Sequence, residues 1–425
     1  KKGEAAVAIG VRAAIFAPFK HLGLIVIDEE HEHTYKQEDL PPLYHVREVA
    51  LKRAELEGAT VVMGTATPSL ESYHQAMNGA FKLLELKERV IGGSPPATKI
   101  VDMGAERDEL ISSLLKQKIA ERLKNGEQVI LLLNRLGFST CVVCKRCRSS
   151  LKCPRCRITL AYHFKEHRLR CHYCGYAVRA TRCRQCGSAE LKFLGAGTEK
   201  LELHLKKLFP MASLRRMDSE IVRRGQHAAI LEEFRQGRIQ ILLGTQMIGL
   251  GLDFPNVTLV GIISADTLLD RPDFRAGERT FQLISQAAGR AGRGQIKGEV
   301  IVQTHHPEHY AIKFALKQDY RGFYAQEIKY RAELNYPPFS HLISLIVEGS
   351  NEKKTAEDAQ KLKQALQSLA QLEIVGPSQA LPYRVRGLYR QKLILKTSKN
   401  VQHGLKTLLQ EMGLARKVNI DVDPL

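Results

Sequence analysis

The sequence lacks several features that would place it in a membrane or secretory class. It has no tryptophan among 425 residues, and aromatic residues make up only 6%. No apolar run approaches the roughly 20 residues that a membrane-spanning helix needs. The first residues, which begin with Lys1 and Lys2, contain no apolar signal-peptide core. We therefore expect no membrane partner and a cytoplasmic location.

A phosphate-binding loop is also absent. The pattern Gly-x-x-x-x-Gly-Lys-Ser/Thr, whose backbone amides and lysine hold nucleotide phosphates, occurs nowhere in the sequence. Strand-like sequence begins almost at once, at residues 6–9. We expect the first domain to begin upstream of Lys1, and this chain alone to bind ATP poorly.

Positive charge is abundant and unevenly placed. The net charge is +19, and residues 141–192 carry 13 Lys and Arg against two Asp and Glu. Such a balance can simply keep a protein soluble, but charge this concentrated favours a polyanionic partner. Because aromatic side chains are few, binding is expected to rest on backbone electrostatics and to weaken steeply with salt.

The same segment holds eight of the nine cysteines, arranged as four Cys-x-x-Cys pairs. Two such turns complete a four-cysteine zinc site, so four turns predict two structural zinc ions, with redox-active or unbound thiols as the alternative. Zinc binding would lower the segment's charge from +11 to about +7 and leave it basic. The predicted ligands are Cys144, Cys147, Cys153, Cys156, Cys171, Cys174, Cys183 and Cys186.

The pairing of the four motifs stays open. The spacing between Cys156 and Cys171 suits a ribbon, which would leave the first pair to meet the fourth in a nested arrangement. Pairing in sequence order is the alternative. The ninth cysteine, Cys141, is expected to be a small apolar residue at a strand end.

Alternating apolar runs and helical patterns predict an α/β protein with parallel sheets. Breaker-rich residues 92–96 read as a linker, and the cysteine segment interrupts the second α/β unit as an insertion. The last segment has a βαββαβ order, which predicts a ferredoxin-like domain. The predicted strands are 6–9, 24–27, 60–63, 129–133, 239–243, 257–263, 300–303, 342–347, a pair across 380–395, and 418–422; the predicted helices are 46–56, 109–124, 199–208, 352–372 and 402–412.

Consecutive carboxylates follow the predicted strand 24–27, in the run Asp28-Glu29-Glu30-His31. In motor ATPases one such carboxylate holds Mg²⁺ and the next activates the attacking water. An acidic strand end without function is the alternative. The loop Gly64-Thr65-Ala66-Thr67-Pro68 favours the ATPase interpretation, because such a loop can link nucleotide state to lobe movement.

Two further motifs occur later in the chain. Arg290 and Arg293 lie in Gln286-Ala287-Ala288-Gly289-Arg290-Ala291-Gly292-Arg293, and at a helix start both would point toward a γ-phosphate. Gly244-Thr245-Gln246-Met247 follows another predicted strand. One motif alone is weak evidence, but the ordered set of four indicates a two-lobed nucleic-acid motor.

Taken in order, these motifs resemble the PriA family of bacterial replication-restart proteins, DNA helicases of superfamily 2. The cysteine block is inserted after Asn134-Arg135-Leu136-Gly137-Phe138, as in that family, and the resemblance covers essentially the whole chain. Further shared runs are Tyr35-Lys36-Gln37-Glu38, Gln303-Thr304-His305 and Asp421-Val422-Asp423-Pro424.

The resemblance implies an α/β fold with two RecA-like lobes, a zinc insert in the second lobe and a C-terminal ferredoxin-like domain. It implies an ATP-dependent 3′→5′ DNA helicase that recognises stalled or forked DNA and starts replication restart by primosome assembly. The implied regions are residues 1–90 (the remainder of lobe 1), 91–105 (linker), 106–138 and 193–310 (lobe 2), 139–192 (two-zinc insert) and 311–425 (fork-binding domain).

Cofactors and partners follow from the same resemblance. ATP with Mg²⁺ and two structural Zn²⁺ ions are the implied cofactors. Forked and single-stranded DNA, primosome proteins and single-stranded-DNA-binding protein are the implied partners of a monomeric chain. Without the phosphate-binding loop, this chain alone is expected to be inactive as an ATPase.

Site residues are carried over by position. Asp28 becomes the Mg²⁺ ligand and Glu29 the base, while Arg290 and Arg293 contact the γ-phosphate, with Arg293 as the finger. Further nucleotide contacts are implied at Gln286, Gly251 and Asp253, and DNA contacts or coupling at Tyr35, Lys36, Thr65, Thr67, Thr245 and Gln246.

The sequence departs from the family pattern at two places. Leu250 stands where the family usually has lysine, and Ile221-Val222 replaces a usual pair of threonines. These changes favour the alternative of a catalytically silent fork-binding protein that loads primosome partners, whereas the retained carboxylate and arginine runs oppose it. An RNA helicase shares the motor motifs, and only the cysteine insert argues against it.

Overall fold

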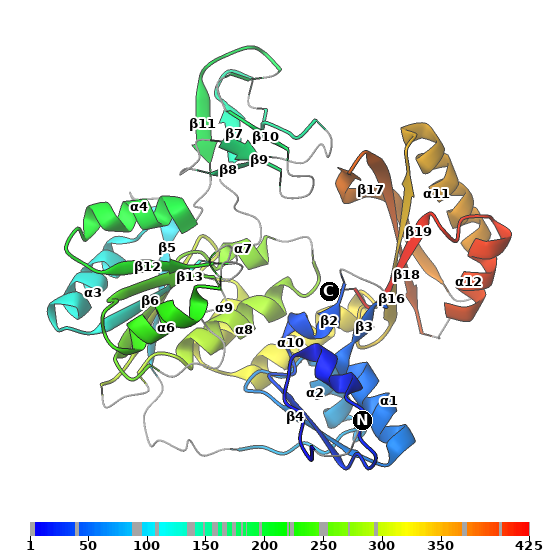
Figure 1. Ribbon diagram of the computed structural model, residues 1–425, viewed down its shortest axis with the longest axis horizontal. Coiled ribbons are helices and arrows are strands. Elements are labelled where there is room, and N and C mark those ends of the chain that lie inside the picture. Colours follow the sequence, from blue (N-terminus) through cyan, green and yellow to red (C-terminus); the bar gives the residue numbers. More distant parts are fainter. Residues whose placement is uncertain are drawn as a thin grey trace. The chain divides into compact units, whose positions relative to one another are not determined.

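The structure is a computed structural model, and it divides the chain into two compact units (Figure 1). Unit 1 comprises Lys1–Leu84, Ile328–Leu381 and Leu388–Leu425, and unit 2 comprises Glu85–Glu327 and Pro382–Gly387. The residues described are 5–38, 42–86, 96–106, 110–133, 141–147, 149–154, 160–163, 168–171, 176–179, 182–183, 185–194, 198–218, 221, 225–245, 254–270, 273–292, 296–367, 372–398 and 402–424.

The first part of unit 1 is a small α/β layer. Strands β1 (Leu24–Asp28) and β4 (Thr60–Gly64) pair in parallel, and α1 (Val46–Glu57) packs on them through Ile27 and Ala50. Helix α1 ends at Gly58, whose φ of 70° suits glycine at a helix terminus. Short elements complete the layer: η1 (Arg12–Phe16), η2 (His33–Tyr35), β2 (Lys36–Gln37), β3 (Tyr44–His45) and α2 (Leu70–Met77).

The prediction of a buried strand at residues 6–9 is wrong. These residues are not in a strand, and Val7 and Ile9 are 73% and 96% exposed. An apolar run forms a stable strand only with a hydrogen-bonded neighbour and a covered face. No strand pairs with this run within the described residues. Strand β1 also has one uncovered face, since Ile27 is buried but Val26 is 63% exposed.

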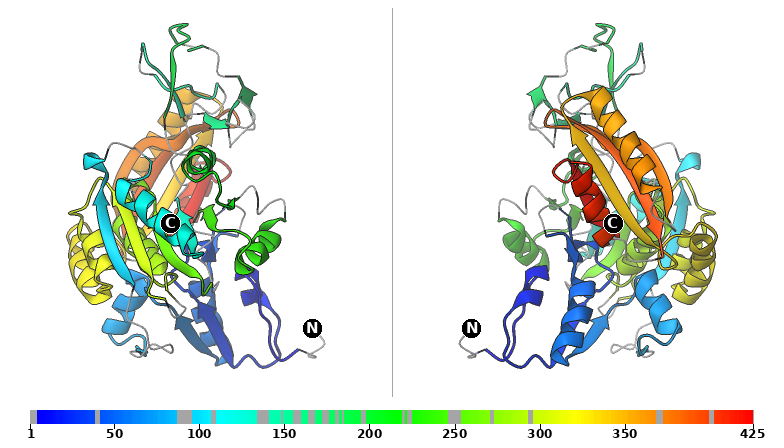
Figure 2. Two further views of the ribbon diagram at one scale, coloured as in Figure 1. Left: turned by 90° about the vertical axis from the view of Figure 1, so that its left-hand side faces the viewer. Right: turned by 90° about the vertical axis from the view of Figure 1, so that its right-hand side faces the viewer.

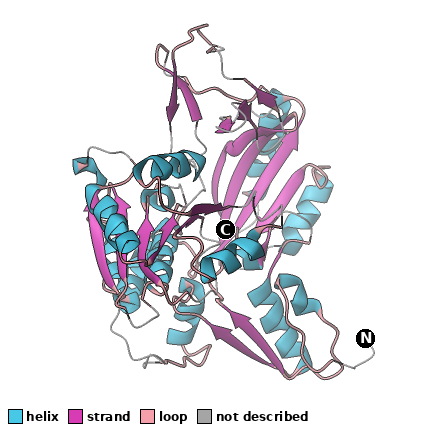
Figure 3. Ribbon diagram, turned by 60° about the vertical axis from the view of Figure 1, so that its left-hand side comes forward, coloured by secondary structure: helices cyan, strands magenta, loops and turns pink. Residues whose placement is uncertain are grey.

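A six-stranded parallel sheet forms the body of unit 2 (Figure 3). Its parallel α/β type agrees with the prediction, but residues 97–102, inside the predicted linker 91–105, form an edge strand of this sheet, and the strand at 214–217 is not among those predicted. The central strands of the sheet are buried along their whole length, as expected for a parallel sheet with helices on both faces. Helices α3 (Ser113–Lys124) and α4 (Thr198–Leu208) share a hydrophobic core with the sheet, and α8 (Ala276–Ala288) packs against two of its strands. The strand order is β12 (Leu214–Met217), β13 (Ile241–Gly244), β6 (Gln128–Leu132), β14 (Val257–Ile262), β15 (Glu299–Thr304) and β5 (Ala97–Asp102).

The sequence predicts two helices of unit 2, at 109–124 and 199–208, and misses the others that the structure describes. Helix α3 begins at Ser113, four residues after its predicted start, because Ser112 caps it by accepting the Leu115 backbone N–H. The bounds are η3 (Met103–Ala105), α3 (Ser113–Lys124), α4 (Thr198–Leu208), α6 (His227–Arg235), α7 (Asp266–Leu269), α8 (Ala276–Ala288) and α9 (Tyr310–Leu316).

The cysteine-rich segment forms its own five-stranded antiparallel sheet. Its core is small and contains Val142, Leu160 and Leu169 together with two cysteines. A core of this size gives little stability by itself, so metal binding is the natural source of its stability. The strand order is β10 (Ala177–Val178), β9 (Arg168–Arg170), β8 (Ala161–His163), β7 (Cys141–Cys144) and β11 (Leu191–Leu194).

The C-terminal segment has the predicted ferredoxin-like topology. Its antiparallel sheet has the order β17 (Glu373–Val385), β18 (Leu388–Thr397), β16 (His341–Gly349) and β19 (Val418–Val422). Helices α11 (Glu352–Leu366) and α12 (Gln402–Glu411) cover one face (Figure 2), and α10 (Tyr320–Glu333) precedes the domain. Helix α11 is shorter than the predicted 352–372, because it is capped at Gln367. None of the described helices has the length and apolarity needed to cross a bilayer.

Candidate functional sites

The carboxylate run leaves β1 through a strained turn. Asp28 is the last residue of the strand, and Glu29 has a φ of 47°, in the left-handed region that non-glycine residues rarely adopt. The Glu29 backbone N–H donates to Asp28 Oδ1 at 3.0 Å. Strain of this kind collects where a side chain must be held in one direction for function.

The next residue, Glu30, is the anchor of this turn. Its side chain is almost fully buried and accepts hydrogen bonds from the Ser69 backbone N–H at 2.6 Å and the Ser72 hydroxyl at 3.1 Å. The Arg47 guanidinium lies 3.5 Å from the same carboxylate. Ser69 is the N-cap of α2, where a negative charge is favourable. Glu30 therefore fixes the carboxylate run to α2.

His31 ties the carboxylate run to the loop after β4. Its Nδ1 lies 2.6 Å from Thr65 Oγ1, and the Thr67 backbone N–H donates to the same hydroxyl at 3.0 Å. Burial lowers the pKa of His31 below 6.5, against the raising effect of Glu32, so the imidazole is neutral at pH 7. The structure thus links Thr65 to His31, which follows the carboxylates, and links Thr67 to Thr65.

Tyr35 and Lys36, predicted as DNA-binding or coupling residues, contact other parts of the protein. The Tyr35 hydroxyl donates to the Asp28 carbonyl at 2.7 Å, and burial together with the Asp28 charge raises the Tyr35 pKa. The Lys36 ammonium is buried 2.9 Å from Asp421 Oδ1 and donates to the Val422 carbonyl. The loop after Asp28 is therefore held at both ends.

The predicted helix start at the arginine run is wrong. Helix α8 contains Gln286 and ends at Ala288, so Arg290 follows its C-terminus. Gly292 has a φ of 70°, and a Cβ there would lie 2.2 Å from the Gly298 backbone nitrogen, so only glycine fits. Arg293 lies outside the described residues, as do the predicted contacts Gln246, Gly251 and Asp253, together with Leu250. Thr245 directly follows β13.

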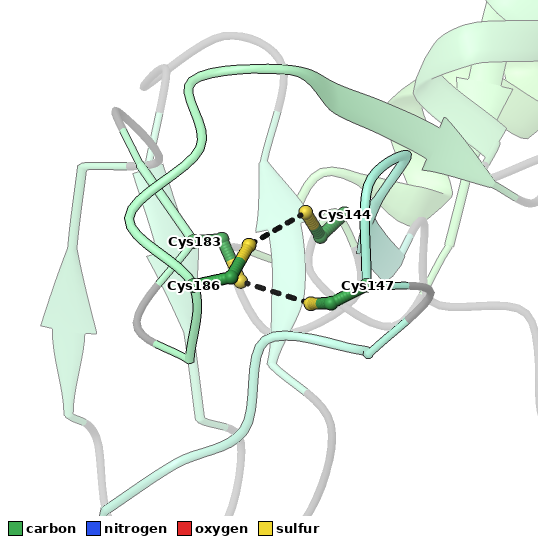
Figure 4. Close-up of side chains that lie close together, drawn as sticks. All are labelled: Cys144, Cys147, Cys183 and Cys186. Atoms are coloured by element: carbon green, nitrogen blue, oxygen red, sulfur yellow. Dashed lines mark hydrogen bonds between the residues drawn. The ribbon is translucent and has the colours of Figure 1, made fainter.

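Four cysteines form a compact cluster (Figure 4). The sulfurs of Cys144, Cys147, Cys183 and Cys186 all lie within 4.8 Å of one another, which is the nested pairing of the first and fourth motifs. The Cys144–Cys186 and Cys147–Cys183 distances are 3.5 and 3.6 Å. A tetrahedral zinc with bonds of about 2.3 Å separates its sulfurs by about 3.8 Å, so the cluster has the size and donors of a zinc site.

The cysteine pKa values differ in direction within this cluster because the thiols lie so close together. Backbone N–H donors at Cys186 and Gln185 lower the pKa of Cys183 to about 6. A backbone N–H at Ser188 favours the Cys186 thiolate, but burial and the three neighbouring thiols outweigh it and raise that pKa to about 12. Four thiolates cannot share this volume unless a positive ion compensates them.

Half of the second predicted zinc site is described. Cys153 and Cys171 are each 1% exposed and lie in the core of the insert. The Cys171 backbone N–H donates to the Tyr176 carbonyl at 2.7 Å. Their predicted partners, Cys156 and Cys174, lie outside the described residues.

Sequence reasoning missed the structural role of Gln303, whose side chain has no exposed surface. Its carboxamide accepts from the Ser112 backbone N–H at 2.8 Å and donates to the Leu110 and Ile263 carbonyls at 3.0 Å each. It thus joins the start of α3 to the end of β14. Only its position at the end of a buried strand, β15, could have indicated this.

His341 and Asp423 form a pH-dependent hydrogen bond near the C-terminus. A hydrogen bond to Asp423 raises the pKa of His341 above 6.5, against partial burial. The contribution of this hydrogen bond to the stability of the fold is therefore fully present below pH 6.5 and is lost as pH rises through the folded-state pKa of His341. In an NMR titration, we expect Asp423→Asn to return the His341 pKa toward 6.5; an unchanged value would contradict the assignment.

Three family models match parts of the chain. They are the primosomal protein N C-terminal domain over residues 332–425, the PriA DNA helicase Cys-rich region over 153–179, and the helicase conserved C-terminal domain over 196–295. The cysteine-rich match and the four-sulfur cluster together support zinc binding by this chain.

Known proteins match over nearly the whole chain. Replication restart protein PriA of Bacillus subtilis is 44% identical over 96% of this chain and 51% of its own length. Its counterpart from Chlamydia pneumoniae is 40% identical over 100% of this chain and 59% of its own length. The solved structure of S. cerevisiae Dbp5 bound to RNA and ADP BeF3 is 14% identical over 71% of this chain and 57% of its own, with a TM-score of 0.36.

The chain thus spans between one half and about three fifths of the length of these two relatives. Sequence identity of 40% or more over essentially the whole chain, with matched helicase, cysteine-rich and C-terminal regions, is far above what chance similarity gives. This chain belongs to the PriA family of replication restart proteins.

Proposed function

We propose that the chain is the motor portion of an ATP-dependent 3′→5′ DNA helicase that recognises forked DNA and starts replication restart. The observation that carries the proposal is the turn after β1. Asp28 and Glu29 leave the strand together, and Glu30 and His31 fix them to α2 and to Thr65. Such a turn suits a Mg²⁺ ligand beside a water-activating base.

Roles follow for the predicted residues. Asp28 would bind the Mg²⁺ of MgATP, and Glu29 would accept the proton of the attacking water. Thr65 would respond to nucleotide binding at this site through its contact with His31. Arg290 and Arg293 would stabilise the charge on the γ-phosphate, with Gln286, Gly251 and Asp253 as further nucleotide contacts. Thr67, Thr245 and Gln246 remain proposed DNA-coupling residues.

We infer two zinc ions in the insert, held by the first and fourth cysteine pairs and by the second and third. Their role would be structural, since four cysteine ligands leave no open position for substrate. The basic residues around them would contact the DNA backbone. Primosome proteins and single-stranded-DNA-binding protein are the proposed protein partners, and the monomeric state and cytoplasmic location stay predictions.

Binding of forked DNA tests the electrostatic part of the proposal. With about six phosphate contacts, affinity should fall by about 10³-fold between 50 and 200 mM salt. Fluorescence anisotropy with a labelled fork measures this directly, and an uncharged analogue of the fork backbone is the control. Affinity that hardly changes with salt would exclude the proposed mode of binding.

ATP hydrolysis separates the helicase from the silent fork-binding protein. The full-length gene product should hydrolyse ATP when DNA is added and should unwind a fork with a 3′ single strand. A protein that binds forks and partners without hydrolysing ATP would support the silent alternative. Hydrolysis driven by RNA in preference to DNA would support an RNA helicase.

A further inference from the structure

Within unit 1, an ion pair with a buried lysine joins residues 28–36, here called the hydrolytic loop after the proposed roles of Asp28 and Glu29, to strand β19 near the end of the chain. The Lys36 side chain is 5% exposed, and its ammonium lies 2.9 Å from Asp421 Oδ1 in β19. It also donates to the Val422 carbonyl in the same strand. Burying an unpaired ammonium group costs free energy. The buried position of Lys36 therefore depends on the position of β19, which carries its partner Asp421.

Lys36 is connected to the carboxylate run through its neighbour in the sequence, Tyr35. It directly follows Tyr35, whose hydroxyl donates to the Asp28 carbonyl at 2.7 Å. A displacement of β19 would therefore pull on Lys36, shift Tyr35 and move the backbone that carries Asp28. The residues involved are close-packed, and packed interiors transmit such displacements.

A second buried ion pair reaches the same turn from another side. Arg331 in α10 is 1% exposed, and its Nη1 lies 3.4 Å from Glu71 Oε1 and donates to the Pro337 carbonyl at 3.2 Å. Glu71 is in the first turn of α2, next to the residues that hold Glu30. Asp421 in β19 thus contacts Lys36 at the end of the loop, and Arg331 in α10 contacts Glu71 beside the residues that hold Glu30.

We propose that Asp421 and Arg331 are positioning residues, through which DNA binding by the C-terminal domain adjusts the geometry of the hydrolytic loop. DNA bound by the C-terminal domain is thereby linked to the rate of ATP hydrolysis. This inference rests on the proposed function, and it assigns the link to two specific ion pairs.

The test is the ratio of DNA-stimulated to basal ATP hydrolysis in the full-length protein. Asp421→Asn should lower this ratio at least tenfold, while basal hydrolysis and fork affinity change by less than twofold. The matched control is Glu348→Gln, which breaks an ion pair of 3.0 Å to Arg390 that lies within the C-terminal domain. The exposed fractions of Asp421 and Glu348, 23% and 27%, are closely similar, and the control should keep the wild-type ratio.

A second variant keeps the test decisive if Asp421→Asn does not fold. The double substitution Arg331→Met and Glu71→Leu removes both charges of the pair, and Arg47, which also faces Glu71, keeps its ion pair with Glu30. It should also lower the ratio at least tenfold. If either folded variant keeps the wild-type ratio, or lowers basal and stimulated rates equally, the positioning role is wrong. If the wild-type protein shows no stimulated hydrolysis, the proposed function fails first.

Discussion

Replacing Cys144 with serine is expected to remove one zinc ion from the protein and to disrupt the pairing of β7 with β11 beside that zinc site. Cys144 is fully buried, and its sulfur lies 3.5 Å from that of Cys186. Structural zinc contributes about 10–16 kcal/mol in small zinc domains, which is more than the small core of this insert can replace. Native mass spectrometry should show two zinc ions in the wild-type protein and one in the variant.

The control for this prediction is Cys141→Ser, which alters the one cysteine outside the four pairs. It should keep both zinc ions and the wild-type protease resistance of residues 141–194. A Cys144→Ser protein that retains two zinc ions and an intact insert would show that Cys144 is not a ligand. A wild-type protein with one zinc ion would leave the second proposed site without support.

Glu29→Gln is expected to lower DNA-stimulated ATP hydrolysis of the full-length protein by about 10³-fold, since a general base contributes a factor of this order. The amide keeps the size of the side chain but cannot accept the proton of the attacking water. Because Glu30 and His31 anchor the turn independently, the fold and the affinity for DNA should change little. Steady-state kinetics with and without forked DNA measures the loss.

Glu32→Gln is the matched control, since Glu32 is the carboxylate that follows Glu30 in the same loop. It should keep hydrolysis within about threefold of the wild type, in line with the small effects of most partly exposed substitutions. Equal losses in the two variants would mean that the loop, and not the Glu29 carboxylate, is needed. Unchanged hydrolysis in Glu29→Gln would assign the base to another residue.

Much of the fold could be predicted because its strands are short apolar runs with clear boundaries. Strands β6, β14 and β15 are buried on both faces, so apolar residues occupy consecutive positions within each of them. Residues 6–9 show the same pattern without forming a strand. An apolar run in the sequence does not indicate whether a neighbouring strand is present to pair with it.

The helix end at the arginine run could have been recognised from the sequence. Glycine close behind a helical pattern is a common signal for a helix end, and here Gly289 caps α8 while Gly292 takes a positive φ. The interpretation as a helix start came from the expected direction of the two arginines and not from the local pattern.

Other features of the site have no local signal. Among three consecutive carboxylates, nothing in the sequence distinguishes the buried anchor Glu30 from its neighbours. Lys36 and Val422 are separated by 386 residues, so no spacing rule connects them. The cysteine spacing left two pairing schemes open, and the positions of the sulfurs of Cys144, Cys147, Cys183 and Cys186 decide for the nested one.

The most direct test of the account is ATP hydrolysis by the full-length gene product, measured with and without forked DNA. We expect hydrolysis that rises at least tenfold with the fork and falls to background in Glu29→Gln. A zinc-loaded protein that binds the same fork but hydrolyses no ATP would contradict the motor assignment and leave a fork-binding protein without catalysis.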